Sequence, residues 1–528
     1  MERLETKREI TFYAIFVFFW ILCACFMRDA TRALFIVGGC VVAMFVYVFR
    51  EKLYRSGRKL RIALIVAALS LPLLPFGTEY IHGLKRDLFV AAVWMFVAAG
   101  LVLFMDGFMR SPLFMKKENS RVVKVLFFLV PLPTLLIEWA RCFPAKTSPD
   151  TIVQLDQIAR NAYSDTHPFT HTLSMKLLMS VHDSLSSVIF FQIALIVLVF
   201  GCLCLYFYKR GVSGRLLLPL LALTFCIPYV VEYTLYPWKD IPFSVAQLLI
   251  SFELMILCDR GTLRTANGVW MGLGIAAVFL FRHNGALAAV FTIAVLLLLA
   301  IRRNRVLLTG AIVALAVILL MKTAVYGHYG VIPNTDGTKY AMLGKQICSV
   351  VYYDGRYDAE QRRQIEEIIM PVEMIKENYN WNHGESFLWY PIADAEGQYR
   401  FFGLTLGNRL PELLKLCLAL LPRNFAIMAY DFLGSSSLMW RFDVNLTAAN
   451  MSYLYILLIA GALVLRGKRF AVLPFAPTLI NVFSVIISNI SSETRYAYPT
   501  MLCFAPLLIY SYYILNRSRN PLWRSGSV

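Results

Sequence analysis

The sequence predicts an all-α polytopic membrane protein. Hydrophobic residues make up 59% of the 528 positions, and the mean hydropathy is +0.62, both far above the values of a soluble domain. Apolar runs of roughly 20 residues, the length that a helix needs to cross a bilayer, recur along most of the chain. Basic residues crowd into alternate short loops between these runs, as in chains that cross the membrane repeatedly.

Each apolar run predicts one spanning helix, and we expect about fourteen of them. The predicted spans are residues 10–27, 33–49, 62–78, 88–106, 122–140, 186–208, 216–235, 241–258, 268–282, 285–301, 306–324, 452–465, 470–488 and 498–515. The first span follows Lys7 and Arg8 in the manner of a secretory signal peptide. No small-residue cleavage site follows it and further spans come immediately, so we expect it to be retained.

The positions of lysine and arginine predict the orientation of the chain. The basic clusters are Arg50, Lys52, Arg55, Arg58, Lys59 and Arg61; Arg110, Lys116, Lys117, Arg121 and Lys124; Lys209, Arg210 and Arg215; Arg302, Arg303 and Arg305; Arg466, Lys468 and Arg469; and the tail after Asn516. By the positive-inside rule, these loops and both termini face the cytoplasm. The formal charge of +18 then reflects membrane orientation, and we expect membrane lipids rather than nucleic acid as partners.

The remaining polar segments all fall on the opposite, extracytoplasmic face. They are residues 143–183, 236–240, 281–285, 326–451 and 491–496. Unlike the inner loops, they combine carboxylates, histidines, aromatic side chains and single cations. Any chemistry is therefore expected at the outer face.

The outer segment 326–451 is too long for a structureless loop, so we expect helical structure within it. Residues 408–421 place apolar side chains at the spacing of one helical face. These side chains are Leu410, Leu413, Leu414, Cys417, Leu418 and Leu421. Such a helix either lies on the membrane surface or forms the core of a small outer domain.

The chain lacks the sequence motifs of disulfide-rich, metal-binding and nucleotide-binding proteins. The 11 cysteines lie mostly within spans and show no disulfide framework or metal-like spacing. The chain contains no CxxC, Walker or dinucleotide fingerprint, so an ATP-driven pump is not expected.

Asp150 has two compatible interpretations. It follows Pro149 and precedes a predicted helix at 151–162, so its carboxylate could cap the first free amides of that helix. A carboxylate held just above the membrane could also act as a general base that takes a proton from an acceptor hydroxyl. A fixed cap would hold the base in place.

Asp165, His167 and His171 cluster in the same outer segment. They could form a polar turn before a predicted helix at 169–181, or bind a divalent cation or a phosphate. A third clear metal ligand is missing, so we expect hydrogen bonds to a phosphate or a sugar. No cofactor is required, and a divalent metal is possible.

Single cations stand at the outer ends of several spans, namely Lys239, Arg282 and Arg495. Each could be an interfacial anchor whose charge reaches into water. Their shared face favours a second interpretation, in which the bundle brings them together on one anionic headgroup. Their polar neighbours are Asp240, His283, Asn284, Glu493 and Tyr496.

The order of these motifs resembles that of the bacterial multi-spanning membrane proteins of the GT-C glycosyltransferase class, from about residue 122 to the end. The motifs are Ser148-Pro-Asp150, Ser164-Asp-Thr-His-Pro168, Trp238-Lys-Asp240, Arg282-His-Asn-Gly285 and Glu493-Thr-Arg-Tyr496. Unlike the pattern usual in that class, the acidic residues of the first outer loop are not adjacent. The general base is therefore either Asp150 or Asp165.

The resemblance implies an inverting transfer of a sugar from a polyprenyl-phosphate carrier to an extracytoplasmic glycan, lipid or polymer. It also implies a plasma (inner) membrane with the active site on its outer face. Lys239, Arg282 or Arg495 would hold the phosphate. The other substrate-binding residues would be His167, His171, Asp240, His283, Asn284, Glu493 and Tyr496.

The resemblance also implies a division of the chain. Residues 1–121 would form a four-span accessory region, and residues 122–324 a GT-C-like seven-span module with its first outer loop at 141–185. An extracytoplasmic helical region would follow at 325–451. The last region, 452–528, would contain three spans and a cytoplasmic tail.

Two other functions stay open. A transporter or flippase of lipid-linked oligosaccharides would also need many spans, but such proteins place charges near the bilayer midplane and often show repeated halves. A polymerase or ligase of surface polysaccharide would share the donor and the outer face. It would differ in the size of the transferred glycan, which the sequence does not report.

Overall fold

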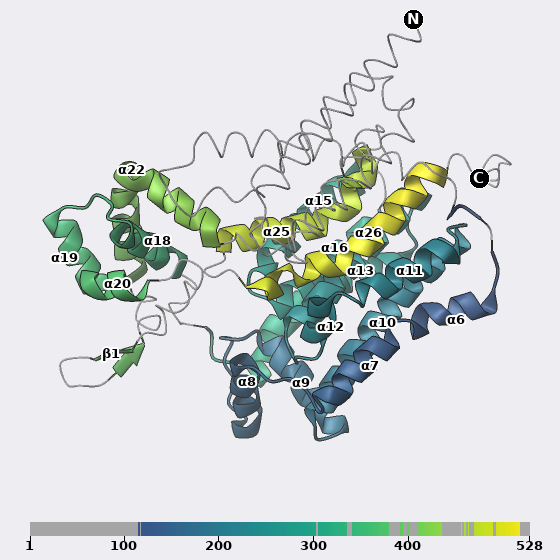
Figure 1. Ribbon diagram of the computed structural model, residues 1–528, viewed down its shortest axis with the longest axis horizontal. Helices are drawn as coiled ribbons and strands as arrows, with labels where there is room; N and C mark the ends of the chain where they lie inside the picture. The colour runs from purple at the N-terminus through teal and green to yellow at the C-terminus, as the bar shows by residue number, and fades with distance from the viewer. Residues whose placement is uncertain are drawn as a thin grey trace, which may run out of the picture.

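The computed structural model describes residues 114–116, 118–302, 305–334, 341–379, 391–393, 399–401, 409–435, 456, 459–460, 463, 469–488 and 493–517. Within these ranges the chain is almost entirely helical (Figure 1), which confirms the predicted class. Two short strands, β1 (Pro391–Ala393) and β2 (Tyr399–Phe401), pair antiparallel. The predicted spans between residues 10 and 106, and most of the span at 452–465, lie outside the described residues.

In the described part, 6 helical segments are long and apolar enough to cross a membrane. They are α6 (Arg121–Leu129) with α7 (Leu132–Arg141), α10 (Leu185–Lys209), α13 (Asp240–Arg260), α16 (Val306–Leu320) continued by η3 (Met321–Val325) and α17 (Tyr326–His328), α22 (Leu410–Ser435), and η8 (Thr494–Ala497) with α26 (Tyr498–Asn516). The bent pair α11 (Gly214–Thr224) and α12 (Pro228–Thr234), with an angle of 66°, would add another. These helices support a multi-pass membrane protein, whereas the predicted count of about fourteen is not confirmed.

Shorter apolar helices lie where further spans were predicted. They are α14 (Thr265–Phe281), α15 (Gly285–Arg302) and α25 (Ala476–Ser488), the last preceded by η7 (Arg469–Phe475). Figure 1 shows α10, α13, α25 and α26 side by side, and α26 contacts α10, α11, α12, α13 and α25. Nearly every residue of α26 is buried, so this helix forms the centre of the described bundle.

A buried carboxylate joins one end of the bundle. Asp259, at the end of α13, accepts a hydrogen bond from Tyr206 at 2.5 Å and from Tyr513 at 2.7 Å. It also pairs with Arg210 at 2.9 Å and with Arg517 at 3.3 Å. Four donors compensate a side chain that is 0% exposed, so this contact ties the ends of α10, α13 and α26 together without leaving an unpaired charge.

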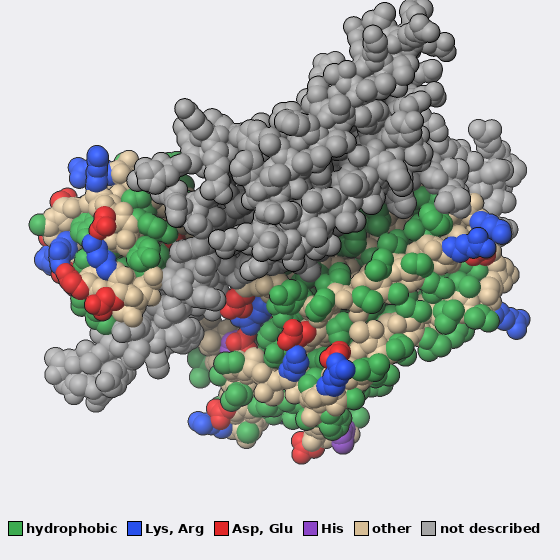
Figure 2. All heavy atoms as spheres, viewed as in Figure 1, with side chains coloured by type: hydrophobic (Ala, Val, Ile, Leu, Met, Phe, Trp, Pro, Cys, Tyr) green, Lys and Arg blue, Asp and Glu red, His purple; other side chains and the backbone are tan. Residues whose placement is uncertain are grey.

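On the helices of the bundle, most charged side chains lie near the helix ends. Figure 2 shows them there, with a mainly hydrophobic surface between the two ends. This distribution is expected of helices whose middle parts lie in hydrocarbon, because a charge at the bilayer centre is costly.

Small residues bring α14 and α16 into close contact. A Cβ added at Gly272 would lie 2.6 Å from the carbonyl oxygen of Gly310, and one at Gly268 would lie 2.8 Å from that of Val306. Only glycine permits these backbone approaches, and small residues four positions apart are a common means of packing helices in membranes.

A separate lobe is formed by α18 (Ala341–Tyr352), α19 (Ala359–Ile368), α20 (Val372–Asn378) and the first half of α22, seen at the left of Figure 1. These helices surround an apolar core of their own. The packing favours the small-domain interpretation of this segment over a helix lying alone on the membrane.

The helix predicted at 408–421 differs from α22 in length and in its buried face. The helix continues to Ser435, with a break at Asn424 where φ is −128° and ψ is 19°. Leu413 and Cys417 are buried as predicted, but Leu414 and Leu418 are 43% and 57% exposed. The positions Leu416 and Leu420 are buried in their place, because α18 and α19 pack on a face rotated from the predicted one.

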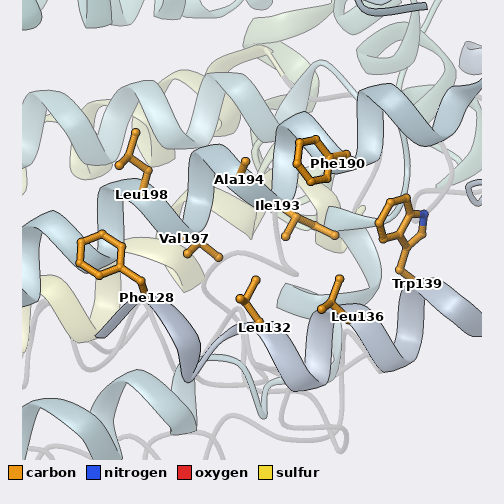
Figure 3. A pocket seen from close by; sticks show the side chains of 9 residues that line it. All are labelled: Phe128, Leu132, Leu136, Trp139, Phe190, Ile193, Ala194, Val197 and Leu198. Carbon is orange, nitrogen blue, oxygen red and sulfur yellow. The ribbon is translucent and has the colours of Figure 1, made fainter. Parts of the chain in front are cut away.

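An apolar cavity of about 410 Å³ lies between α6, α7 and α10. Figure 3 shows the side chains that line it, among them Phe128, Leu132, Trp139, Phe190 and Val197. The lining of this cavity is almost wholly apolar. An apolar lining is expected where a cavity lies beside lipid.

The close contact between α14 and α16 can be tested by Gly272→Leu. The added side chain meets backbone that has no room to move away, so we expect a loss of at least about 2 kcal/mol in the free energy of unfolding. Thermal unfolding in detergent measures the change. Gly327→Leu is the matched control because nothing lies within 4 Å of a Cβ added there; equal losses in the two variants would refute the contact.

Candidate functional site

Asp150 lies in the first turn of α8 (Pro149–Arg160), and Ser148 caps that helix. The Ser148 Oγ accepts a hydrogen bond from the Thr151 amide at 3.4 Å and another from Trp238 Nε1 at 2.8 Å. The interpretation of Asp150 as the cap is therefore wrong. Its carboxylate is available to side-chain partners, and its negative charge is favourable in the first turn of a helix.

One oxygen of Asp150, Oδ2, is shared by two cations. Lys239 Nζ lies 3.0 Å from it, and Arg495 Nη1 lies 3.3 Å from it. His167 Nδ1 is 3.9 Å from the same oxygen and 3.1 Å from Lys239 Nζ. At most 24% of each of these side chains is exposed, so the charges interact with little screening.

Segments far apart in the sequence position this group. Asp150 comes from α8, and His167 from the loop between α8 and α9 (Phe169–Val181). Lys239 is the residue before α13, and Arg495 lies in η8 directly before α26. We refer to Asp150, His167, Lys239 and Arg495 together as the outer cluster, after the face predicted for it.

The outer cluster changes the acidity of two of its members. Burial by itself would raise the pKa of the Asp150 carboxyl, but Lys239, His167 and Arg495 together hold it well below its usual range. Burial and the Lys239 ammonium lower the pKa of His167 to about 4, although Asp150 opposes this shift. At neutral pH, Asp150 is therefore a carboxylate and His167 a neutral imidazole.

A second ion pair lies beside the outer cluster. Arg282, which follows α14, pairs with Asp240 in the first turn of α13. Asp240 is 1% exposed, and within the described chain its Oδ2 has no hydrogen-bond partner. Arg282 also donates from Nε to Asn284 Oδ1 at 3.0 Å, so its charge is compensated inside the fold.

Tyr496 connects the two groups of charges. Its ring lies 4.8 Å from the Arg282 guanidinium and 5.3 Å from that of Arg495. Arg495 also pairs with Glu493 and lies 5.4 Å from the Trp238 ring. Cation–π contacts of this kind orient a guanidinium and keep it partly desolvated.

Asp165 is engaged by several donors. Its Oδ1 accepts hydrogen bonds from the Phe169 amide and from the Tyr326 hydroxyl, both at 3.1 Å. Its Oδ2 accepts from Lys322 Nζ at 2.9 Å, and its own amide donates to the Ile332 carbonyl at 2.9 Å. Asp165 thus anchors its loop to α17 and η3, whereas the ion pairs of Asp150 among the described residues join it to the two cations Lys239 and Arg495 through Oδ2.

His171 lies inside the protein rather than at the exposed part of the site. It is 2% exposed, and its Nδ1 contacts the side-chain amide of Gln154 at 3.0 Å. Burial lowers its pKa to about 3. His171 therefore joins α9 to α8, the helix that carries Asp150.

The two remaining predicted residues lie near the end of α14. His283 is exposed and forms a hydrogen bond with the Thr166 backbone. The Asn284 amide, besides accepting from Arg282, lies 3.5 Å from Ser484 Oγ in α25. The contact with Thr166 places His283 beside the loop that carries His167.

Sequence reasoning missed Lys322 and Ser148. Lys322 is the one charged residue between Val306 and Tyr326, and it lies in the π-helical turn η3. A lone cation in an apolar run is a recognisable signal of a functional or paired residue, as are π-turns within helices. Ser148 precedes Pro149 and a helix, which is a common N-cap pattern, and it performs the capping role predicted for Asp150.

In the described ranges, no group of three or more histidine, cysteine, aspartate or glutamate side chains is placed to hold a metal ion. The possible need for a divalent metal stays a prediction. The cations that balance Asp150 in this structure are side chains of the protein.

No family model, no curated protein and no solved structure matches this chain.

The lowered pKa of His167 can be tested by the pH dependence of stability. The unfolded chain takes up a proton near pH 6.5 that the folded site excludes down to about pH 4, so stability falls as the pH decreases through this window. His167 should account for about 2 kcal/mol of lost unfolding free energy between pH 7 and pH 5. Asp150, whose pKa is shifted downward, contributes below this window.

Thermal unfolding of the wild type and of His167→Gln in detergent at both pH values measures this contribution. The variant should lose less stability than the wild type on going from pH 7 to pH 5. An equal loss in both proteins would show that His167 exchanges its proton as freely in the folded chain as in the unfolded one.

Proposed function

We propose that the protein is a membrane glycosyltransferase that moves a sugar from a polyprenyl-phosphate carrier to an extracytoplasmic acceptor. The observation that carries the proposal is the outer cluster, in which a carboxylate, a neutral imidazole and two cations converge from separate segments. It lies at one end of helices that are long and apolar enough to cross a membrane. A lipid carrier would present its phosphate at that level of the bilayer.

Lys239 and Arg495 are the proposed phosphate ligands. Both are within hydrogen-bonding distance of an anionic oxygen, that of Asp150, and both cations bind phosphate oxygens by charge-assisted hydrogen bonds. They would also stabilise the negative charge that develops on the phosphate as it leaves the sugar. Arg282, the third cation predicted for this role, is paired with Asp240 and is assigned to positioning Tyr496.

Asp150 is the proposed general base. It would take the proton of an acceptor hydroxyl while that oxygen attacks the anomeric carbon from the side opposite the phosphate. A bond from the acceptor oxygen to the sugar forms, the bond from the sugar to the phosphate oxygen breaks, and the polyprenyl phosphate leaves with the bonding electrons. The configuration at the anomeric carbon inverts. The neutral His167, beside both Asp150 and Lys239, would hydrogen-bond the sugar or the acceptor.

A flippase of lipid-linked glycans is the second candidate. Gln247 in α13 and Asn481 in α25 are buried, and within the described chain their amide groups have no hydrogen-bond partner. Uncompensated polar groups inside spans are a feature of transport paths. The ion pairs that surround Asp150 lie at helix ends instead, which supports a surface reaction.

The proposal is tested by offering purified protein a panel of short-chain polyprenyl-phosphate sugars and following release of free lipid phosphate. Asp150→Asn should lower turnover by at least about 100-fold, because the base is removed while its shape is kept. Asp156→Asn is the matched control, since Asp156 lies on the same helix, is half exposed and pairs only with Arg160 in the described contacts.

The outcomes separate the candidates. Turnover by wild type and Asp156→Asn that is lost in folded Asp150→Asn supports the glycosyltransferase. Loss in Asp165→Asn with full activity in Asp150→Asn would move the base to Asp165. No turnover of any donor, together with faster movement of a labelled lipid-linked glycan across liposomes, would replace the enzyme with a flippase.

A further inference from the structure

We propose that Asp150 occupies the place of the donor phosphate in the resting site, so that phosphate binding displaces Asp150 from Lys239 and Arg495 and thereby releases the base. The inference rests on the proposed function, which it deepens by naming how the site is regulated. In this scheme the base and the substrate are competing anions for the same two cations.

The geometry of the outer cluster supports competition rather than simultaneous binding. Lys239 and Arg495 approach the same oxygen of Asp150, at 3.0 Å and 3.3 Å. A phosphate oxygen that accepts hydrogen bonds from both cations would need that same position. Two anionic oxygens cannot share it, because like charges at contact distance repel strongly in a partly buried site.

The charge balance leads to the same conclusion. In the resting structure Lys239 and Arg495 are matched by Asp150 and Glu493, and Arg282 is matched by Asp240. These groups carry no excess positive charge with which to attract a phosphate. A phosphate can gain full ion pairs only if a resident carboxylate gives up its partners, and Asp150 is the carboxylate that touches both Lys239 and Arg495.

The consequence for the reaction is a timing mechanism. While Asp150 is paired with both cations, its affinity for a proton is low and it is a weak base. Once a phosphate takes the cations, Asp150 loses that stabilisation and becomes a stronger proton acceptor next to the bound donor. Deprotonation of the acceptor is thereby favoured only when a donor is present.

Displacement should be local, because other contacts hold the rest of α8. Gln154 bonds to His171 and Thr172, and Gln157 bonds to Ser164. Only the first turn of α8 depends on the ion pairs of Asp150. Phosphate binding should therefore loosen this turn while it immobilises the starts of α13 and η8.

The first experiment measures the affinity of detergent-solubilised full-length protein for farnesyl phosphate by titration calorimetry. Asp150→Asn should bind about tenfold more tightly than the wild type, because the competing anion is gone. Asp156→Asn, which removes the same charge from the same helix, should bind as the wild type does. Lys239→Met should bind about tenfold more weakly, and adding Asp150→Asn to it should restore much less than tenfold.

Two further ligands identify what is recognised. Inorganic phosphate should show the same ranking of variants if the phosphate group alone competes, and farnesol should show no dependence on Asp150. If neither phosphate compound binds any variant, the phosphate-donor function itself fails. If farnesyl phosphate binds the wild type and Asp150→Asn equally, the donor function stands and the competition is refuted.

A measurement on the wild type makes the test independent of variant folding. Amide hydrogen exchange with and without farnesyl phosphate should become faster in the first turn of α8 and slower at the start of α13 and in η8. Slower or unchanged exchange in that turn of α8 on ligand binding would overturn the proposal.

Discussion

The end of the bundle that carries the outer cluster is organised by the ion pairs of a single carboxylate oxygen. Oδ2 of Asp150 joins α8 to the start of α13 through Lys239 and to the start of α26 through Arg495. The apolar packing of the helices brings these ends into the same region but does not select an orientation for their charges. The shared oxygen does, because two cations that close would repel one another without an anion between them. His167 lies against Lys239, and Trp238 donates a hydrogen bond to Ser148, the cap of α8.

The sequence was sufficient to predict the helical class and most of the elements around the site. Apolar runs mark α10, α13 and α26 to within a few residues, because the width of the hydrocarbon core imposes their length. The number of spans could not be obtained in the same way. Segments such as α14 and α15 are apolar but short, and α22 is long enough to span although much of it packs in a separate lobe.

The sequence predicted which residues form the site better than it predicted which carboxylate pairs with which cation. Asp150, His167, Lys239 and Arg495 were all recognisable as polar residues at the outer ends of spans. Which carboxylate each cation contacts depends on the rotation of each helix about its own axis. The sequence does not specify that rotation. Arg282 was expected at the phosphate for this reason, whereas the fold places it on Asp240. Asp165 is the alternative base that the sequence leaves open beside Asp150, and its contacts with Tyr326 and Lys322 depend on packing that the sequence does not specify.

Each end of α13 and α26 is joined by a carboxylate, but the two carboxylates come from different parts of the fold. At the far end, Asp259 belongs to α13 itself and is held by donors from α10 and α26, so that junction is internal to the bundle. At the end that carries the outer cluster, the joining carboxylate is that of Asp150, which belongs to α8 and not to α10, α13 or α26. Because α13 and α26 also pack directly against each other, the two helices stay together whichever anion lies between Lys239 and Arg495. Under the proposed competition the bundle thus has one permanent junction, at Asp259, and one whose anion can be exchanged.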